Sequence, residues 1–177
     1  MWYPATVTTP ATAEPVTLAE AKRHVNATEF ADDDTCLTDL IAMARSHVEK
    51  YCNATFATQT VTARATGWCD FDHLSFGPVQ SITSIAYVDS SGDPQTLDDT
   101  VYEHRGDAIV VKYGQTWPSI QPRSLITLTA VIGTENVPPA VKHAMLIRLA
   151  DLYETRETAD ESGWTTFDSL LSNHRYY

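Results

Sequence analysis

The chain has 177 residues, of which 12 are lysine or arginine and 23 are aspartate or glutamate, so its formal net charge is −11 at pH 7. Its hydrophobic content of 43% is typical of a globular protein and excludes a disordered chain. No apolar run reaches the length of a membrane span, no secretory signal opens the chain, and the acidity disfavours tight binding to nucleic-acid phosphates. We therefore expect a soluble, non-secreted protein.

The N-terminal part begins with residues 1–16, which are rich in threonine, alanine and proline and are predicted to form an extended arm. A short helix is expected to begin at Thr17, because Thr17 and Glu20 have the spacing of a capping box. It should end near Asn26. The acidic run at 32–34 complements the positive end of a second helix more simply than it forms a metal site.

The second helix is the clearest element, because apolar residues recur along one helical face. These residues are Leu37, Leu40, Ile41, Ala44, Val48 and Tyr51. Asn53 is predicted to end the helix in a left-handed conformation. Residues 17–53 thus form a predicted helical part.

Between residues 58 and 132 the hydrophobic period becomes two, which predicts an antiparallel β part. The predicted strands are 59–65, 81–88, 95–97, 101–104, 108–112 and 124–131. Turn residues separate them, notably at 89–94 and at 105–107. Short antiparallel strands of this kind favour a small sandwich or barrel, so the predicted fold class is α+β.

A long helix over 138–157 is predicted to complete the helical part, with prolines in its first turn. Its apolar surface is wide and must be buried. It is formed by Val141, Ala144, Met145, Leu146, Leu149, Leu152 and Tyr153. Residues 158–177 follow as a tail that is unusually apolar and aromatic. Because Ser162 and Gly163 break the helix, we expect the part of the tail from Trp164 to Tyr177 to be mobile in the free protein and ordered only against a partner.

The densest group of chemically active side chains is Cys69, Asp70, Asp72 and His73. Alternation along a strand would place Cys69 and His73 on one face and the two aspartates on the other, so we expect a loop or edge strand without a metal. The three cysteines include no CxxC pair, which predicts free thiols. No HExxH, GxSxG or phosphate-binding glycine motif occurs, and we predict no cofactor and no enzymatic activity.

Two alternatives stay open at this stage. A monomeric β-sandwich that binds carbohydrate would use Trp68, Trp117 and Tyr113 as a stacking platform. A small metal-dependent hydrolase would be centred on Asp70, Asp72 and His73. The sequence favours this second alternative less than the first.

The run at 14–22, EPVTLAEAK, resembles the N-terminal signature of the head–tail connector (adaptor) proteins of tailed bacteriophages and related gene transfer agents. The similarity extends over residues 13–175. Further matching runs are 37–51, 77–82, 87–92, 137–144 and 152–157. No single run is diagnostic, but their order and spacing are specific.

The resemblance implies a structural subunit of a twelve-fold ring beneath the portal of a filled head. Such a ring prolongs the DNA channel and supports a stopper or tail-terminator protein, and DNA passes through without specific binding. The protein would be found in the virion at the head–tail interface, and in the host cytoplasm during assembly. An acidic channel lets DNA slide because like charges oppose phosphate contacts.

The resemblance also implies roles for particular residues. The helices at 35–52 and 139–156 would pack around the ring. The residues assigned to this packing are Leu37, Leu40, Ile41, Val48, Met145, Leu149 and Leu152. The tail would face the portal. Its assigned residues are Phe167, Leu170, Leu171, Arg175, Tyr176 and Tyr177.

Overall fold

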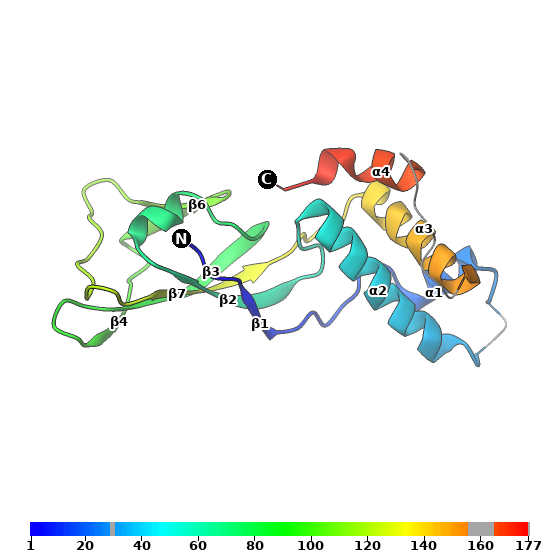
Figure 1. Ribbon diagram of the computed structural model, residues 1–177, viewed down its shortest axis with the longest axis horizontal. Coiled ribbons are helices and arrows are strands. Elements are labelled where there is room, and N and C mark those ends of the chain that lie inside the picture. Colours follow the sequence, from blue (N-terminus) through cyan, green and yellow to red (C-terminus); the bar gives the residue numbers. More distant parts are fainter. Residues whose placement is uncertain (29–30, 156–164, 177) are drawn as a thin grey trace. The chain divides into compact units, whose positions relative to one another are not determined.

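The computed structural model describes residues 1–28, 31–155 and 165–176. The chain divides into two compact units. The β unit comprises Met1–Thr12 and Thr58–Thr134, and the helical unit comprises Ala13–Ala57 and Glu135–Tyr177. Figure 1 shows the α-helices in one unit and the strands, with one short 3-10 helix, in the other, which confirms the predicted α+β class. None of the helices in the described ranges has the length and apolar content needed to span a bilayer.

In the helical unit, α1 (Leu18–His24) begins with the predicted capping box. The backbone N–H of Thr17 donates to the Glu20 carboxylate at 2.8 Å, and the backbone N–H of Glu20 donates to the Thr17 hydroxyl at 3.2 Å. These bonds satisfy donors that the first turn of a helix leaves free. The helix ends close to the predicted Asn26, and its Ala21 side chain is fully buried.

The second helix, α2 (Asp34–Cys52), buries most of the predicted apolar stripe. Its buried residues are Leu37, Ile41, Ala44, Val48 and Cys52. Leu40 is half-buried, because it lies at the margin of the stripe. Asn53 has a φ of 50° and ends the helix in the left-handed conformation, which confirms the predicted cap.

The C-terminal part contributes α3 (Pro139–Thr155), α4 (Thr166–Leu171) and the short 3-10 helix η2 (Ser172–His174). These helices share one core with α1 and α2. Its larger members include Val16, Leu37, Ile41, Val48, Phe56, Val141, Met145, Leu149, Phe167 and Leu171. Residues 156 and 157, the predicted end of the long helix, lie outside the described residues.

The β unit is built on a five-stranded antiparallel sheet with the order β1-β2-β7-β3-β4. Its strands are β1 (Thr6–Thr9), β2 (Gln59–Ala65), β3 (Val79–Val88), β4 (Pro94–Thr96) and β7 (Ile126–Ile132). The hairpin of β5 (Tyr102–Arg105) and β6 (Ala108–Val111) forms a second, two-stranded sheet. The strands β2 to β7 coincide with the predicted runs.

The predicted extended arm contains a strand, β1, which was not predicted from the sequence. Thr6–Thr9 pairs with β2, with Thr6 opposite Thr62 and Val7 opposite Val61. All of its side chains are exposed. It therefore has no apolar alternation that the sequence could reveal, and its backbone pairing with a distant strand defines it.

One face of the large sheet is buried and the other is open. In β7, Ile126, Leu128 and Ala130 are fully buried, whereas the alternate residues Thr127 and Thr129 are half-exposed. The core on the buried side also takes residues from the hairpin and from a 3-10 helix, η1 (Trp68–Asp72). Burial on one face is typical of antiparallel sheets. The hairpin and η1 thus form the second layer of the predicted small sandwich.

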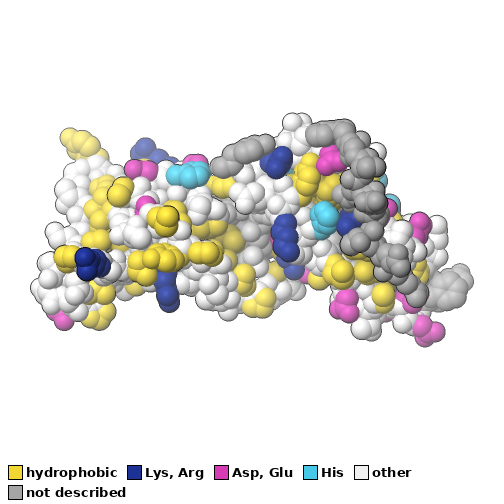
Figure 2. Space-filling view, viewed as in Figure 1, with side chains coloured by type: hydrophobic (Ala, Val, Ile, Leu, Met, Phe, Trp, Pro, Cys, Tyr) yellow, Lys and Arg dark blue, Asp and Glu magenta, His cyan; other side chains and the backbone are white. Residues whose placement is uncertain are grey.

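Among the residues that the structure describes, large hydrophobic side chains are exposed mainly on the β unit. They are Met1, Tyr3, Val7 and Tyr113, with Met43 on the helical unit. Figure 2 shows hydrophobic side chains gathered on the visible face of the β unit. Where apolar side chains gather in one exposed patch, the patch is a candidate for contact with other molecules.

Candidate interaction surface

The C-terminal segment, defined here as Thr165–Tyr176, packs on the helical unit (Figure 1). Phe167 is 7% exposed and Leu171 is fully buried. The Phe167 ring makes edge contacts with His47 and Tyr51 of α2, each with ring centroids 5.4 Å apart. The segment therefore belongs to the core of this unit.

A capping box fixes the start of α4. The backbone N–H of Thr165 donates to the Asp168 carboxylate at 2.8 Å, and the backbone N–H of Asp168 donates to the Thr165 hydroxyl at 3.3 Å. Hydrogen bonds from Thr165 and from Tyr51 lower the pKa of Asp168. The same carboxylate, as acceptor of the Tyr51 hydroxyl, raises the pKa of Tyr51. Asp168 thus links the cap of α4 to α2.

The far end of the segment is bonded to the end of α2. The backbone N–H of Tyr176 donates to the carbonyl oxygen of Cys52 at 2.7 Å, and the Asn53 side-chain amide donates to the carbonyl oxygen of Tyr176 at 3.1 Å. The Arg175 guanidinium lies 5.2 Å from the centre of the Tyr51 ring, in a cation–π arrangement. Burial raises the pKa of the Cys52 thiol to about 11.

These contacts correct the prediction that the tail is mobile in the free protein. Phe167, Leu170 and Leu171 do form one face of a helix, as predicted, but this face packs against α2 and α3 of the same chain. Phe167 and Leu171 are therefore anchors of the segment and have no surface left for a partner. Leu170 and Tyr176 are half-buried, Arg175 is exposed, and Tyr177 lies outside the described residues.

The predicted ring-packing residues are also mostly core. Leu37, Ile41, Val48, Met145 and Leu149 are each at most 5% exposed. The other two, Leu40 and Leu152, are half-buried. These five side chains fill the core that α2 and α3 share, and the packing of the two helices around a ring stays a prediction.

The exposed face of α2 carries other residues, which the sequence prediction missed. An open groove of about 670 Å³ follows this face. It is lined by Ala42, Met43, Ser46, His47, Lys50 and Tyr51. Met43 is 53% exposed. The signal in the sequence was an apolar residue, Met43, on the side of the helix opposite the buried stripe.

An ion-pair network on α2 holds the segments that enter and leave it. Arg45 Nε donates to Glu14 at 2.7 Å, and Arg45 Nη1 donates to Glu49 at 2.9 Å. The other Glu49 oxygen accepts the backbone N–H groups of Phe56 at 2.8 Å and Ala57 at 3.2 Å. Burial lowers the pKa of Arg45, but the two glutamates outweigh it and raise the pKa above its usual value. Arg45 is thus a fixed cation.

The acidic run before α2 binds neighbouring helices. Asp33 accepts the hydroxyl of Tyr153 at 2.8 Å, and Asp34 forms an ion pair with Lys22 at 2.6 Å. Asp34 lies in the first turn of α2, at the positive end that the sequence predicts it to complement. The Asp33 side chain caps no backbone N–H of α2. The run therefore joins α1 and α3 to the start of α2.

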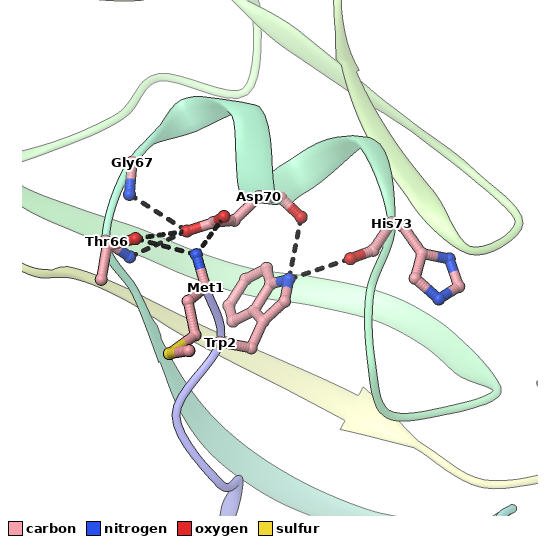
Figure 3. A network of polar contacts seen from close by, with 6 residues as sticks. All are labelled: Met1, Trp2, Thr66, Gly67, Asp70 and His73. Carbon is pink, nitrogen blue, oxygen red and sulfur yellow. Dashed lines mark hydrogen bonds and ion pairs between the residues drawn. The ribbon is translucent and has the colours of Figure 1, made fainter.

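The residues around Asp70 form a 3-10 helix, where the sequence predicted a loop or edge strand. The Asp70 carboxylate accepts the α-amino group of Met1, the backbone N–H and hydroxyl of Thr66, and the backbone N–H of Gly67 (Figure 3). The Trp2 indole N–H donates to the carbonyl oxygens of Asp70 at 2.8 Å and His73 at 2.9 Å. Asp70 therefore anchors the first residues of the chain.

The proposed hydrolase centre does not assemble around this carboxylate. The His73 ring lies 3.2 Å from Asp107 instead, and both of these side chains are exposed, as is Asp72. Among residues 1–28, 31–155 and 165–176, no three His, Cys, Asp or Glu side chains are grouped as metal ligands.

The proposed carbohydrate platform is likewise not formed. Trp68 and Trp117 stack on each other with ring centroids 4.6 Å apart and an interplanar angle of 1°. The Trp68 indole N–H donates to the carbonyl oxygen of Pro118 at 2.8 Å, and both rings pack on the core. Because the two faces cover each other, they present no flat platform with the fully exposed Tyr113.

Comparison with known proteins identifies the fold and the family. The chain is similar to a protein in the neck of an empty GTA particle computed with C6 symmetry, with a TM-score of 0.82 and 18% identity over 99% of this chain and 96% of that one. A chain from the virion of a native gene transfer agent (GTA) particle gives a TM-score of 0.77 at 19% identity, over 98% of this chain and 95% of that one. A chain from the neck of a native GTA particle computed with C12 symmetry gives a TM-score of 0.74 at 18% identity, over 96% of both chains.

The search of curated proteins finds no match. The pattern of the family described as "Phage gp6-like head-tail connector protein" matches residues 15–105. This match begins before α1 and ends with β5, so it includes parts of both units. The chain therefore belongs to the phage gp6-like head–tail connector protein family.

Proposed function

We propose that this chain is a structural, non-enzymatic subunit of the ring that joins the head of a tailed phage or gene transfer agent to its tail. The family match over residues 15–105 carries the proposal. The likeness in fold to neck proteins over 96–99% of the chain supports it.

The ring lies between the portal and a stopper or tail-terminator protein. The C12 symmetry of one neck structure supports a twelve-fold assembly. DNA passes through the ring without specific binding, because a subunit with a net charge of −11 repels phosphates. The subunit is made in the host cytoplasm and is incorporated into the virion at the head–tail interface.

The C-terminal segment makes the contact with the portal. Phe167 and Leu171 hold it on the helical unit, while Arg175 is exposed and Leu170 and Tyr176 are partly accessible. Arginine and tyrosine are frequent anchors of protein interfaces. Each contact is small, but copies arranged in a ring bind together through multivalency.

The test is the assembly of particles without this protein. We expect heads that package DNA and lack tails, and purified protein should restore the joining of heads to tails. The variant Arg175→Glu should bind heads weakly, whereas Arg123→Glu, which makes the same charge change in the β unit, should bind like the wild type. Tailed particles in the absence of the protein contradict the proposal.

A further inference from the structure

The open face of the β-unit sheet contains a hollow of about 510 Å³ beside the edge strand β1. It is lined by Tyr3, Pro4, Thr6, Thr8, Thr62, Arg64 and Leu125. Arg64 is the single charged residue in this lining, is exposed, and has no ion-pair partner in the part of the chain that the structure describes. The hollow thus combines hydroxyl groups, an aromatic ring that is 48% exposed, and one available cation.

The charge of this edge differs from that of the rest of the protein. Residues 1–12 and 58–66 contain no aspartate or glutamate, and Arg64 is their one basic side chain. These residues include β1 and β2, which form one side of the sheet. This side is neutral to basic in a chain whose net charge is −11.

The opposite side of the sheet is acidic. Residues 79–99, which form β3, β4 and their flanks, contain four aspartates and neither lysine nor arginine. Asp89 and Asp98 accept backbone N–H groups in their own turns. Asp93 and Asp99 are exposed and flank β4, the other edge strand.

Arg64 and the acidic residues beside β4 lie at corresponding positions along the strands of the sheet. Arg64 is paired with Thr127, Thr127 with Ala86, and Ala86 with Thr96 of β4, so Arg64 and Thr96 lie in one row across the sheet. Asp93 lies three residues before Thr96, about 10 Å along an extended chain, and Asp99 lies three residues after it, in the turn that follows β4. Asp93 and Asp99 therefore lie on either side of the row of paired residues that contains Arg64.

A closed ring of identical subunits requires two different, complementary surfaces on each subunit. We infer that the hollow around Arg64 and Tyr3 binds the acidic β4 edge, with Asp93 and Asp99, of the next copy of this chain in the ring. This inference rests on the proposed ring and names one of its contacts. Because these groups are exposed, salt weakens the contact between subunits.

The experiment uses charge reversal and mixing of full-length proteins. Arg64→Glu gives a subunit with two acidic edges, and the double variant Asp93→Arg/Asp99→Arg gives one with two basic edges. Sedimentation velocity measures self-association, and copies retained on connector-free, portal-containing heads measure assembly there. We expect each variant alone to lose at least tenfold in retained copies relative to the wild type.

An equimolar mixture should restore retention, because an even-numbered ring such as one with C12 symmetry accommodates alternating subunits. Impaired folding of either variant cannot be repaired by mixing, so restoration is specific for the edge contact. Arg123→Glu is the matched control and should assemble like the wild type.

The inference is overturned if Arg64→Glu assembles normally, or if the mixture fails while both variants keep the melting temperature of the control. It is also overturned if heads retain Arg64→Glu fully but do not accept tails, because the hollow would then bind a tail protein. If the wild type neither self-associates nor binds heads, the proposed function itself fails.

Discussion

The backbone N–H of Tyr176 donates a 2.7 Å hydrogen bond to the carbonyl oxygen of Cys52, the last residue of α2. The Asn53 side chain returns a bond to the Tyr176 carbonyl oxygen at 3.1 Å. The C-terminal segment is thus fixed at this end by backbone groups, and at the other by the buried side chains of Phe167 and Leu171. Loss of the segment therefore affects the stability of the helical unit.

The first prediction concerns Leu171, which is fully buried. Leu171→Ala should lower the free energy of unfolding by about 2–5 kcal/mol, because a cavity replaces a buried side chain. Leu170→Ala, at the half-buried neighbouring position, should cost about 1 kcal/mol or less. Urea denaturation followed by circular dichroism measures both. A cost below about 0.5 kcal/mol for Leu171→Ala means that the segment does not belong to the core.

The second prediction uses the cysteines. Cys36 and Cys69 are exposed, whereas Cys52 is buried with a pKa of about 11. At pH 8 only about one Cys52 thiol in a thousand is ionised, so iodoacetamide should alkylate the two exposed thiols much faster. Deletion of residues 165–177 should accelerate the reaction of Cys52. Mass spectrometry of the peptides measures the alkylation rates. Equal rates at Cys36 and Cys52 in the intact protein would show that the C-terminal segment does not cover Cys52.

The third prediction concerns Glu49, which accepts hydrogen bonds from Arg45, Phe56 and Ala57. Glu49→Ala should cost about 1–3 kcal/mol, because it leaves a partly buried arginine and two backbone donors without their acceptor. The exposed neighbour Lys50→Ala should stay within about 0.5 kcal/mol of the wild type. Thermal and urea unfolding measure the loss of stability in each variant. Equal losses for the two substitutions would show that the hydrogen bonds of Glu49 do not stabilise the protein.

The fourth prediction concerns pH. Burial raises the pKa of Asp70, but hydrogen bonds from the Met1 amino group and from Thr66 outweigh it and hold the pKa below its ordinary value. A lowered pKa in the folded state stabilises the protein above the unfolded value of about 3.9, and this stabilisation is lost as the pH falls through the folded value. The melting temperature of Asp70→Asn should lie below that of the wild type near neutral pH, and the gap should narrow below about pH 4. A gap that stays constant down to about pH 2 would show that the charge of Asp70 is not involved.

Most helices and strands could be predicted because their signals are local. The stripe of α2, the capping box of Thr17 and Glu20, and the alternation of β7 are each set by neighbouring residues. The strand β1 could not be predicted in this way, because its exposed threonines have no buried face and its pairing depends on β2.

The candidate surface was predicted less well, for a physical reason. An apolar helical face at Phe167 and Leu171 predicts that these side chains are buried, but it does not identify the surface that buries them. The structure buries it against the chain's own helices, and it likewise buries Leu37 and Leu149 inside one unit. Residues available to partners, such as Met43 and Arg64, are single exposed side chains, and one side chain does not by itself identify an interaction surface in the sequence.

Electron cryo-microscopy of particles that carry this protein shows whether the chain forms the connector ring. We expect a ring of this fold at the head–tail junction, with the twelve-fold symmetry of the C12 neck structure, and with the Arg64 hollow of each copy against the β4 edge of the next. Density for this fold in the capsid shell or the tail tube, or its absence from the junction of complete particles, would contradict this expectation.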